Sequence, residues 1–322
     1  MSEYNSIPQN PPTSQYVPPS TQGQYIPMHP VSPVTNVQQT APNPNIQPSP
    51  YAQQAYGVPP PHPGYGPGPF IGGIQYAYCA DPMTELNYST GVLIRQQPQF
   101  FEMYTGCESP NRYYVFSQSR QGGMKLLFKC KEISGCCMRN CCPANSREFN
   151  MVIKHIANST YLDDNFQKTF VNVVKPFKCT CCCLERPEMM VTFSESNQPL
   201  GKIKQPFTCC DPKITLYDND GDLKYTIHAD CCQCGILCAS NFFGKMSEAV
   251  FNIYKSNNLT EPPCGTIIKK SANFAELITT ADSYQINFPL GSTPNDKMNL
   301  IAAGLMIDYQ FFEEKAKNHD DN

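Results

Sequence analysis

One segment near the C-terminus constrains the fold more than any other. The run Lys297–Lys315 reads KMNLIAAGLMIDYQFFEEK, and on a helical wheel its apolar side chains cover nearly the whole circumference. A helix that is apolar on all sides must be enclosed by protein or must cross a membrane, because any other setting would expose an apolar face to water. The residues before it favour a helix start, with Thr293 as the cap, Pro294 at the first helical position and Asp296 three residues after the cap. The sequence therefore predicts a C-terminal helix over residues 294–315.

Rough magnitudes favour enclosure by protein. Nineteen residues at about 1.5 Å each reach roughly 28 Å, which is just enough to cross the hydrocarbon. The large apolar residues contribute about −2 to −3.5 kcal/mol to insertion, whereas Asp308 near the centre costs about 2.5–3.5 kcal/mol. We therefore favour a helix threaded through a β-barrel over a lone membrane span. Asp308 is then the polar site of the helix, a buried acid with a polar partner.

The rest of the body has the period-two pattern of short strands. Residues 223–228, LKYTIH, alternate apolar and polar side chains, and Phe149–Ile153 repeats the pattern. Further β-rich runs cover residues 113–116, 125–128, 170–174, 190–193 and 250–254. Turn residues separate these runs by about ten to fifteen positions, which predicts a mainly β barrel or sandwich of about ten to twelve strands.

The first 75 residues differ sharply from this body. Residues 1–69 hold 18 of the 31 prolines and a single charged residue, Glu3. Such a segment buries too little apolar surface to order itself, so we expect a disordered proline-rich tail over residues 1–75 and a folded domain over residues 76–322. Four PxxP spacings suit the aromatic grooves of SH3-type domains, although a solvated spacer is the alternative.

Charge and the N-terminus bear on partners and compartment. The net charge of −3 and the pI near 6.0 give no electrostatic basis for nucleic-acid binding, so no nucleic-acid partner is expected. Residues 1–5 carry no basic region and no apolar run follows, so we expect no secretory signal. Thiols should then stay reduced, and a disulfide framework is not expected.

All 18 cysteines lie in the body, between Cys79 and Cys264. Fourteen fall in four groups, at residues 136–142, 179–183, 209–210 and 231–238. Zinc ligands usually come in CxxC pairs, whereas adjacent residues of a strand point to opposite faces, so zinc stays a minor alternative. With five histidines and no evident thiol–imidazole pair, we do not expect an enzyme of covalent chemistry.

The second group is the densest. In FKCTCCCLE, residues 177–185, four thiols lie within five positions beside a phenylalanine and a lysine. Clustered cysteines suit S-palmitoylation, and two or more acyl chains anchor a protein stably where one does not. We therefore predict covalently attached palmitate at Cys179, Cys181, Cys182 and Cys183.

A run of acids at Asp218–Asp222, DNDGD, raises the possibility of a calcium loop. An EF-hand starting at Asp218 would need glycine at its sixth position and an acid at its twelfth, but Leu223 and Ala229 stand there. The run lies between two alternating segments, which favours a β-hairpin turn.

Several motifs in this order resemble the phospholipid scramblase family. They are the proline-rich tail, GCCMRNCCPANSREFNM (135–151), FKCTCCCLE (177–185), GKIKQPFTCCDPKITLYD (201–218), ADSYQINFPL (281–290) and IDYQFFEE (307–314). The resemblance implies a tubby-like fold, in which a twelve-stranded β-barrel surrounds the C-terminal helix. It also implies palmitoylation within residues 179–183, attachment to the cytosolic face of the plasma membrane, and calcium-stimulated, ATP-independent movement of phospholipids between leaflets.

The resemblance further places the family's calcium segment at residues 280–291. The candidate ligands are Thr280, Asp282, Tyr284, Ile286, Phe288 and Gly291. Thr280 and Gly291 stand where the family has its first and last acids, and calcium affinity follows the number of charged ligands. Calcium binding is therefore expected to be weak, in the millimolar range or absent.

Two functions follow from these features. The first is bidirectional phospholipid movement between bilayer leaflets. The second is a palmitoylated scaffold that recruits SH3-domain proteins through its tail and transports nothing. Both predict a phospholipid membrane as partner, and the position of the C-terminal helix bears on the choice between them.

Overall fold

The computed structural model describes residues 70–71, 74–97, 110–118, 123–135, 138–139, 142, 146–158, 168–178, 185–237, 247–270 and 282–312. All of them belong to the compact unit Pro61–Asn322. The predicted palmitoylation sites, the candidate ligand Thr280 and almost all of the predicted tail lie outside the described residues.

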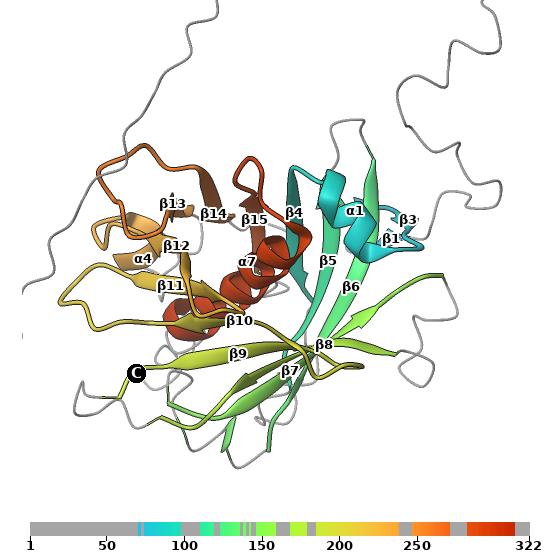
Figure 1. Ribbon diagram of the computed structural model, residues 1–322, viewed down its shortest axis with the longest axis horizontal. Helices are drawn as coiled ribbons and strands as arrows, with labels where there is room; N and C mark the ends of the chain where they lie inside the picture. The colour runs from blue at the N-terminus through green and yellow to red at the C-terminus, as the bar shows by residue number, and fades with distance from the viewer. Residues whose placement is uncertain are drawn as a thin grey trace, which may run out of the picture. The chain divides into compact units, whose positions relative to one another are not determined.

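The body is a closed barrel of twelve antiparallel strands (Figure 1). The strands are β4 (Gly91–Gln96), β5 (Arg112–Gln118), β6 (Met124–Ile133), β7 (Phe149–His155), β8 (Thr169–Lys175), β9 (Glu188–Phe193), β10 (Pro199–Lys204), β11 (Lys213–Asp218), β12 (Leu223–His228), β13 (Ala249–Lys255), β14 (Gly265–Lys269) and β15 (Ser283–Asn287). Neighbouring strands in the sequence pair with one another, and pairing of β15 with β4 closes the sheet. The predicted twelve-stranded barrel is confirmed.

Smaller elements flank the barrel. The short strands β1 (Phe70–Ile71) and β2 (Ile74–Gln75) pair with each other, although the sequence assigns both to the tail. Strand β3 (Ala77–Tyr78) pairs in parallel with β6. Helix α1 (Pro82–Tyr88) and the single turn α4 (Cys234–Leu237) complete the described elements outside the barrel.

Helix α7 (Pro294–Ile307) lies inside the barrel and is surrounded by its strands (Figure 1). All of its residues from Asp296 to Ile307 are buried. At Gly304, an added Cβ would lie 3.1 Å from the Cδ1 atom of Ile286 and 3.3 Å from that of Ile94, so the missing side chain lets the helix pack closely against β15 and β4. The predicted helix within a barrel is confirmed. Within the described residues, no helix reaches the length and apolar character that a membrane crossing requires.

The predicted extent of this helix needs correction. The α-helical run ends at Ile307, and Asp308–Phe312 form a π-helical turn. Such a turn contains an extra residue and rotates the side chains that follow it, so a wheel drawn with α-helical periodicity misplaces them. Residues 313–315 of the predicted helix lie outside the described part of the chain.

The start of α7 forms as expected. The Thr293 hydroxyl accepts a hydrogen bond from the backbone N–H of Asp296, and the Asp296 carboxylate accepts one from the N–H of Thr293, which completes a capping box. Helix α1, which the sequence analysis missed, has the same kind of start, because Asp81 caps it and Pro82 follows. The turn at Asp218–Asp222 is also confirmed: the Asp218 carboxylate accepts two backbone N–H groups of the turn, and Gly221 has a φ of 88°.

Candidate functional site

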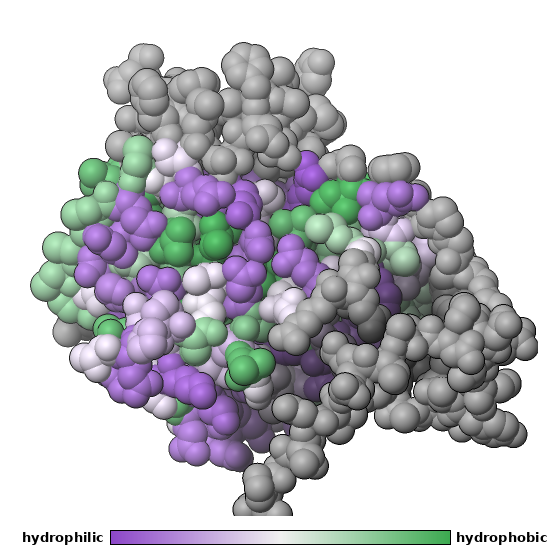
Figure 2. Space-filling model, turned by 90° about the horizontal axis from the view of Figure 1, so that it is seen from above, coloured by the Kyte–Doolittle hydropathy of each residue, from purple (hydrophilic) through white to green (hydrophobic). Residues whose placement is uncertain are grey.

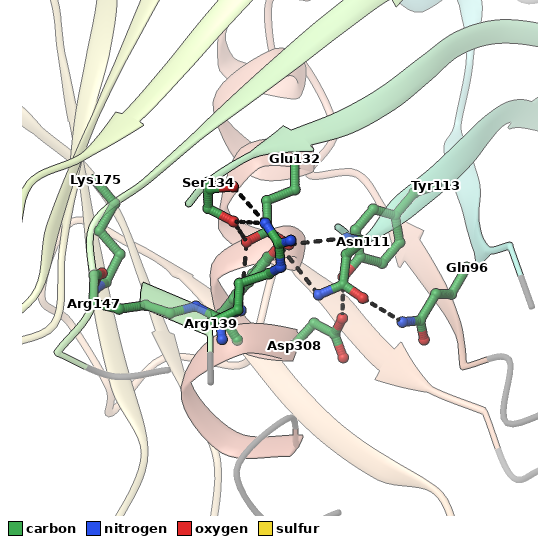
Figure 3. Close-up of polar contacts among 10 residues, drawn as sticks. Gln96, Asn111, Tyr113, Glu132, Ser134, Arg139, Arg147, Lys175 and Asp308 are labelled. Carbon is green, nitrogen blue, oxygen red and sulfur yellow. Dashed lines mark hydrogen bonds and ion pairs between the residues drawn. The ribbon is translucent and has the colours of Figure 1, made fainter. Parts of the chain in front are cut away.

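A network of buried polar side chains surrounds the C-terminal end of α7. Its members come from β5 and its preceding loop, from β6, from the segment before β7, and from the π-helical turn (Figure 3). Tyr309 of the turn connects them, because its hydroxyl donates to Glu132 Oε2 at 2.6 Å and accepts from Asn111 Nδ2 at 3.2 Å. The network therefore joins the helix to the wall of the barrel.

Glu132 on β6 is the centre of this network. Its side chain is fully buried, and its two oxygens accept hydrogen bonds from several donors. Besides Tyr309, these are the backbone N–H of Asn111 at 2.9 Å and the Ser134 hydroxyl at 2.6 Å. Arg139 in turn donates to both the carbonyl and the hydroxyl of Ser134. A carboxylate held by this many donors has a fixed position.

Arg147 supplies the positive charge opposite Glu132. Its Nη2 lies 3.5 Å from Glu132 Oε1, and its guanidinium lies over the Tyr309 ring with Cζ 5.5 Å from the ring centroid. Phe149 stacks on the same ring at 4.2 Å between centroids. Lys175 of β8 donates to the backbone carbonyl of Arg147 at 2.6 Å. Stacking of Phe149 and Arg147 on the Tyr309 ring, together with the ion pair of Arg147 and Glu132, therefore holds the π-helical turn in place.

Asp308 forms a second, smaller cluster on the same turn. The Tyr113 hydroxyl donates to Asp308 Oδ2 and the Tyr284 hydroxyl donates to Oδ1, each at 2.5 Å. Burial raises the pKa of the Asp308 carboxyl to about 6, with a further contribution from the negative charge of Asp282. Hydrogen bonds from the two tyrosines and the positive charge of Lys269 act to lower this pKa. Asp308 is thus a buried acid with two polar partners.

Asp282 and Lys269 lie beside this cluster. Asp282 Oδ2 is 3.1 Å from the Lys269 ammonium, which also lies 4.2 Å from the centroid of the Phe312 ring. The backbone of Asp282 is fixed by Gln96, whose N–H donates to the Asp282 carbonyl at 2.9 Å. Asp282 therefore connects the strand pair β4–β15 to the end of the helix.

The other residues of the predicted calcium segment lie in different surroundings. Tyr284 donates to Asp308, while Ile286 is buried against α7. Phe288 is also buried, and Gly291 occupies the turn after β15 with a φ of 78°. Strand β15 pairs on both sides, so most of its carbonyls belong to the sheet. Among the described residues of this segment, only Asp282 offers a carboxylate, and they do not form a calcium cage.

The opposite end of α7 carries a buried cation. The Lys297 ammonium donates to the carbonyls of Leu86 at 2.7 Å, Asn87 at 3.1 Å and Ser89 at 3.0 Å. Two of these belong to the last turn of α1, where carbonyls lack partners within the helix. Burial lowers the pKa of the Lys297 ammonium. The lysine thus caps α1 and fixes it across this end of the barrel.

Three exposed apolar side chains lie on or beside the strands that lead to the predicted palmitoylation cluster. Ile133, Val174 and Phe177 expose 54%, 41% and 52% of their surface. Ile133 and Val174 both lie opposite Asn150 in the sheet, so they are on the same face of β6–β7–β8, and Phe177 stands two residues before Cys179. We call Ile133, Val174 and Phe177 the outer apolar row. On the face seen from above, by comparison, polar side chains are interspersed with small apolar groups (Figure 2).

Sequence reasoning identified Asp308 but missed most of its surroundings. Glu132 follows the inward-facing Phe128 and Cys130 at a spacing of two, and Lys175 follows Val171 and Val173 in the same way. The signal in the sequence that could have identified these residues was therefore a charged residue at a position of a strand that faces the inside of the barrel. Lys269, which follows Ile267, and Arg147, which precedes Phe149, fit the same rule.

Comparison with known proteins agrees with this architecture. The sequence profile named Scramblase matches residues 73–314, which include every barrel strand and the whole of α7. The chain belongs to the scramblase family. This scramblase-family chain is 28% identical to "Phospholipid scramblase 1" of Rattus norvegicus over 264 residues, covering 78% of this chain and 69% of the rat protein.

Two further relatives show similar overlap. The chain is 28% identical to "Phospholipid scramblase 2" of Bos taurus over 239 residues, covering 73% of this chain and 72% of the bovine protein. It is 24% identical to "Phospholipid scramblase 4" of Homo sapiens over 250 residues, covering 77% of this chain and 67% of the human protein. The predicted family is confirmed.

Proposed function

We propose that this chain moves phospholipids in both directions between bilayer leaflets, without ATP, from the cytosolic face of the plasma membrane. The observation that carries the proposal is the family match over the barrel and its helix. Relatives named as phospholipid scramblases support it, since they match along most of the chain. The activity is a translocation of lipids and involves no covalent chemistry.

Attachment to the membrane is proposed to combine palmitate with the outer apolar row. Palmitoyl groups on Cys179, Cys181, Cys182 and Cys183 would hold the C-terminal end of β8 against the bilayer. The exposed Val174 and Phe177 lie shortly before those cysteines in the sequence, and Ile133 lies on the same face of the sheet as Val174. Apolar side chains there would enter the interface next to the acyl chains and orient the barrel.

The position of α7 bears on the route of the lipid. The helix is enclosed by the strands, and Asp308 in the turn at its C-terminal end is paired with two tyrosines. A polar headgroup crosses hydrocarbon only along a polar path or through a locally thinned bilayer, because its charge is otherwise expensive there. We therefore assign lipid exchange to a disturbance of the leaflet beneath the outer apolar row, with α7 as the support of the barrel.

Calcium enters this proposal as a weak stimulus. The described part of residues 280–291 contributes one carboxylate, and Lys269 already neutralises it. A calcium ion at Asp282 would have to displace that ammonium, so we propose stimulation at millimolar concentration of calcium.

Lipid exchange by the purified protein would test the activity. The palmitoylated full chain is reconstituted into liposomes with a fluorescent phospholipid, and dithionite then quenches the outer leaflet, with and without calcium. We expect loss of the inner-leaflet fluorescence as well. Ile133→Glu should slow this loss, whereas Leu259→Glu, which changes another exposed aliphatic residue, should not. Liposomes that keep their inner-leaflet fluorescence under all conditions would reject transport and leave the scaffold function to be tested with SH3 domains.

Attachment is tested separately in cells. The variant with Cys179, Cys181, Cys182 and Cys183 all changed to serine should move from the membrane fraction to the soluble fraction. The matched control changes Cys209 and Cys210 to serine; these two cysteines are adjacent in the sequence and exposed. A quadruple variant that stays on the membrane would contradict acyl anchoring.

A further inference from the structure

A group of thiols and carboxylates lies where two loops of the barrel meet. One loop follows β10 and contains Asp211, and the other follows β12 and contains Asp230, Cys231 and Cys232. His228 is the last residue of β12. We call these five residues the Cys231 cluster. None of them belongs to the polar network around α7 or to the predicted calcium and palmitoylation segments.

The spacing of three members suits a metal ion. The Sγ atoms of Cys231 and Cys232 are 4.0 Å apart, and a carboxylate oxygen of Asp230 lies within 4.8 Å of both. Two thiolates about 2.3 Å from a tetrahedral zinc ion are about 3.8 Å apart. A zinc ion could therefore bind both thiolates with a change of only a few tenths of an ångström.

Asp211 extends the cluster from the neighbouring loop. Its Oδ1 accepts the backbone N–H of Cys231 at 3.2 Å, and its carboxylate also contacts the Cys231 thiol. On the other side, Asp211 Oδ2 lies 3.3 Å from His228 Nε2. Carboxylates that bind a metal are themselves hydrogen-bonded by outer groups that orient them, and His228 is placed to do this for Asp211.

The loop that carries the two thiols is fixed in place by the barrel. The Gln233 side chain donates to the carbonyl of Val250 at 2.8 Å and accepts its N–H at 2.7 Å. At Gly235, an added Cβ would lie 2.5 Å from the carbonyl oxygen of Glu248, so the chain approaches β13 more closely than any other residue type allows. The Asp230 carboxylate accepts the N–H of Cys232 at 2.8 Å. The thiols are therefore held close together before any ion binds.

The electrostatics of the cluster also favour a cation. Asp211 and Asp230 place two carboxylates beside the thiols of Cys231 and Cys232. A divalent ion that replaces the thiol protons would balance the negative charge that otherwise accumulates here.

We propose that the Cys231 cluster binds one Zn²⁺ ion. Cys231 and Cys232 would bind as thiolates after releasing their protons to water, Asp230 and Asp211 would bind through one oxygen each, and His228 would position Asp211. Thiolate ligands select zinc over calcium, so this site is distinct from the predicted calcium segment. Four protein ligands leave no open position, which gives the ion a structural role: it would tie the loop after β10 to the turn after β12.

Metal content of the purified full chain tests this site. We expect one zinc per chain by elemental analysis, and after replacement by cobalt we expect the near-ultraviolet band of thiolate-to-cobalt charge transfer. The double variant Cys231→Ser/Cys232→Ser should lose both signals. His228→Ala should keep the band but weaken zinc affinity about 10- to 100-fold, as loss of an outer partner does. The control Cys264→Ser changes a half-buried thiol outside the cluster and should leave both signals unchanged.

Three results would overturn the site. In the first, the wild-type chain holds no more zinc than the background and gives no charge-transfer band after loading with cobalt. In the second, the double variant binds zinc as tightly as the wild type. In the third, mass spectrometry finds Cys231 and Cys232 acylated. Circular dichroism shows whether the double variant is folded. If it is not, Asp230→Asn replaces it, because this change keeps both thiols and should still weaken zinc affinity at least tenfold; unchanged affinity would also overturn the site. None of these measurements depends on lipid transport.

Discussion

The two ends of α7 are fixed inside the same barrel by opposite chemistry. At the N-terminal end a single buried cation, Lys297, is held by three backbone carbonyls of α1 and the residue that follows it. At the C-terminal end two carboxylates, Glu132 and Asp308, are held by hydroxyl, amide and guanidinium donors. One end relies on main-chain geometry, and the other relies on side chains drawn from several strands.

This difference determines how each end should respond to change. Backbone carbonyls carry no net charge and do not titrate, so the Lys297 end should lose only hydrogen bonds when the lysine is removed. The carboxylate end contains charges that balance one another in a dry environment, so removal of one partner leaves another uncompensated. It should therefore be both more sensitive to mutation and more sensitive to pH.

The largest effect is expected at Glu132. Changing Glu132→Ala leaves the buried Arg147 without its carboxylate, so the free energy of unfolding should fall by about 3–5 kcal/mol. Urea unfolding followed by circular dichroism measures the change. The control Glu188→Ala removes a partly exposed glutamate that pairs with Lys178 and Lys202, and it should cost about 1 kcal/mol or less. Equal losses for the two variants would show that the C-terminal network is not specially sensitive.

Asp308 should make stability depend on pH. Its pKa is raised in the folded state from an ordinary 3.8 to about 6, so between these values the folded protein binds more protons than the unfolded one. The contribution of Asp308 is therefore most favourable below pH 4 and declines as the pH rises through 6, by about 3 kcal/mol in total.

Comparison with Asp308→Asn isolates this contribution, because the variant does not titrate and keeps one oxygen that accepts from one of the two tyrosines, while its amide NH2 can donate to the other hydroxyl. Urea unfolding at several pH values should show the stability of the wild type falling relative to the variant between pH 4 and 6. A difference that stays constant across this window would mean that Asp308 keeps an ordinary pKa, and the contrast between the two ends would lose its electrostatic basis.

The N-terminal end of α7 should lose less stability when its buried charge is removed. Replacing Lys297→Met keeps the apolar stem but leaves three carbonyls without their shared donor, which should lower the free energy of unfolding by about 2 kcal/mol. Lys213→Met, which removes a partly exposed lysine bonded to Asn257, is the matched control and should be close to neutral. A loss as large as that of Glu132→Ala would contradict the proposed difference between the ends.

The smallest effect is expected at the capping box. Thr293→Ala removes the hydroxyl that accepts the N–H of Asp296, and loss of such a cap costs about 1 kcal/mol. Thermal or urea unfolding detects this, with Thr260→Ala in an exposed loop as the control. If Thr293→Ala were neutral, enclosure by the barrel alone would hold this end of the helix, and the capping signal in the sequence would have no energetic role.

Much of the fold could be read from local patterns. Period-two alternation and β-rich composition together located most of the barrel strands, and the apolar circumference of α7 together with the cost of Asp308 favoured enclosure. The polar side chains of the helix did not mark a solvent-facing side, because Asn299 in α7 and Gln310 in the π-helical turn are both buried. Asn299 donates to the carbonyl of Leu200 on β10. A barrel wraps the helix on every side, so even its polar side chains have strands opposite them.

What the sequence alone determined is the class of each segment, because periodicity and capping depend on residues a few positions apart. It also marked Asp308 as a costly charge that needs a partner. Only the tertiary structure decided which residues satisfy that need: Tyr113 lies 195 positions before Asp308 in the chain, and the carbonyls that hold Lys297 lie 208 to 211 positions before it. Closure of the sheet brings such distant groups together, and no local pattern specifies which inward side chains will face one another across the barrel.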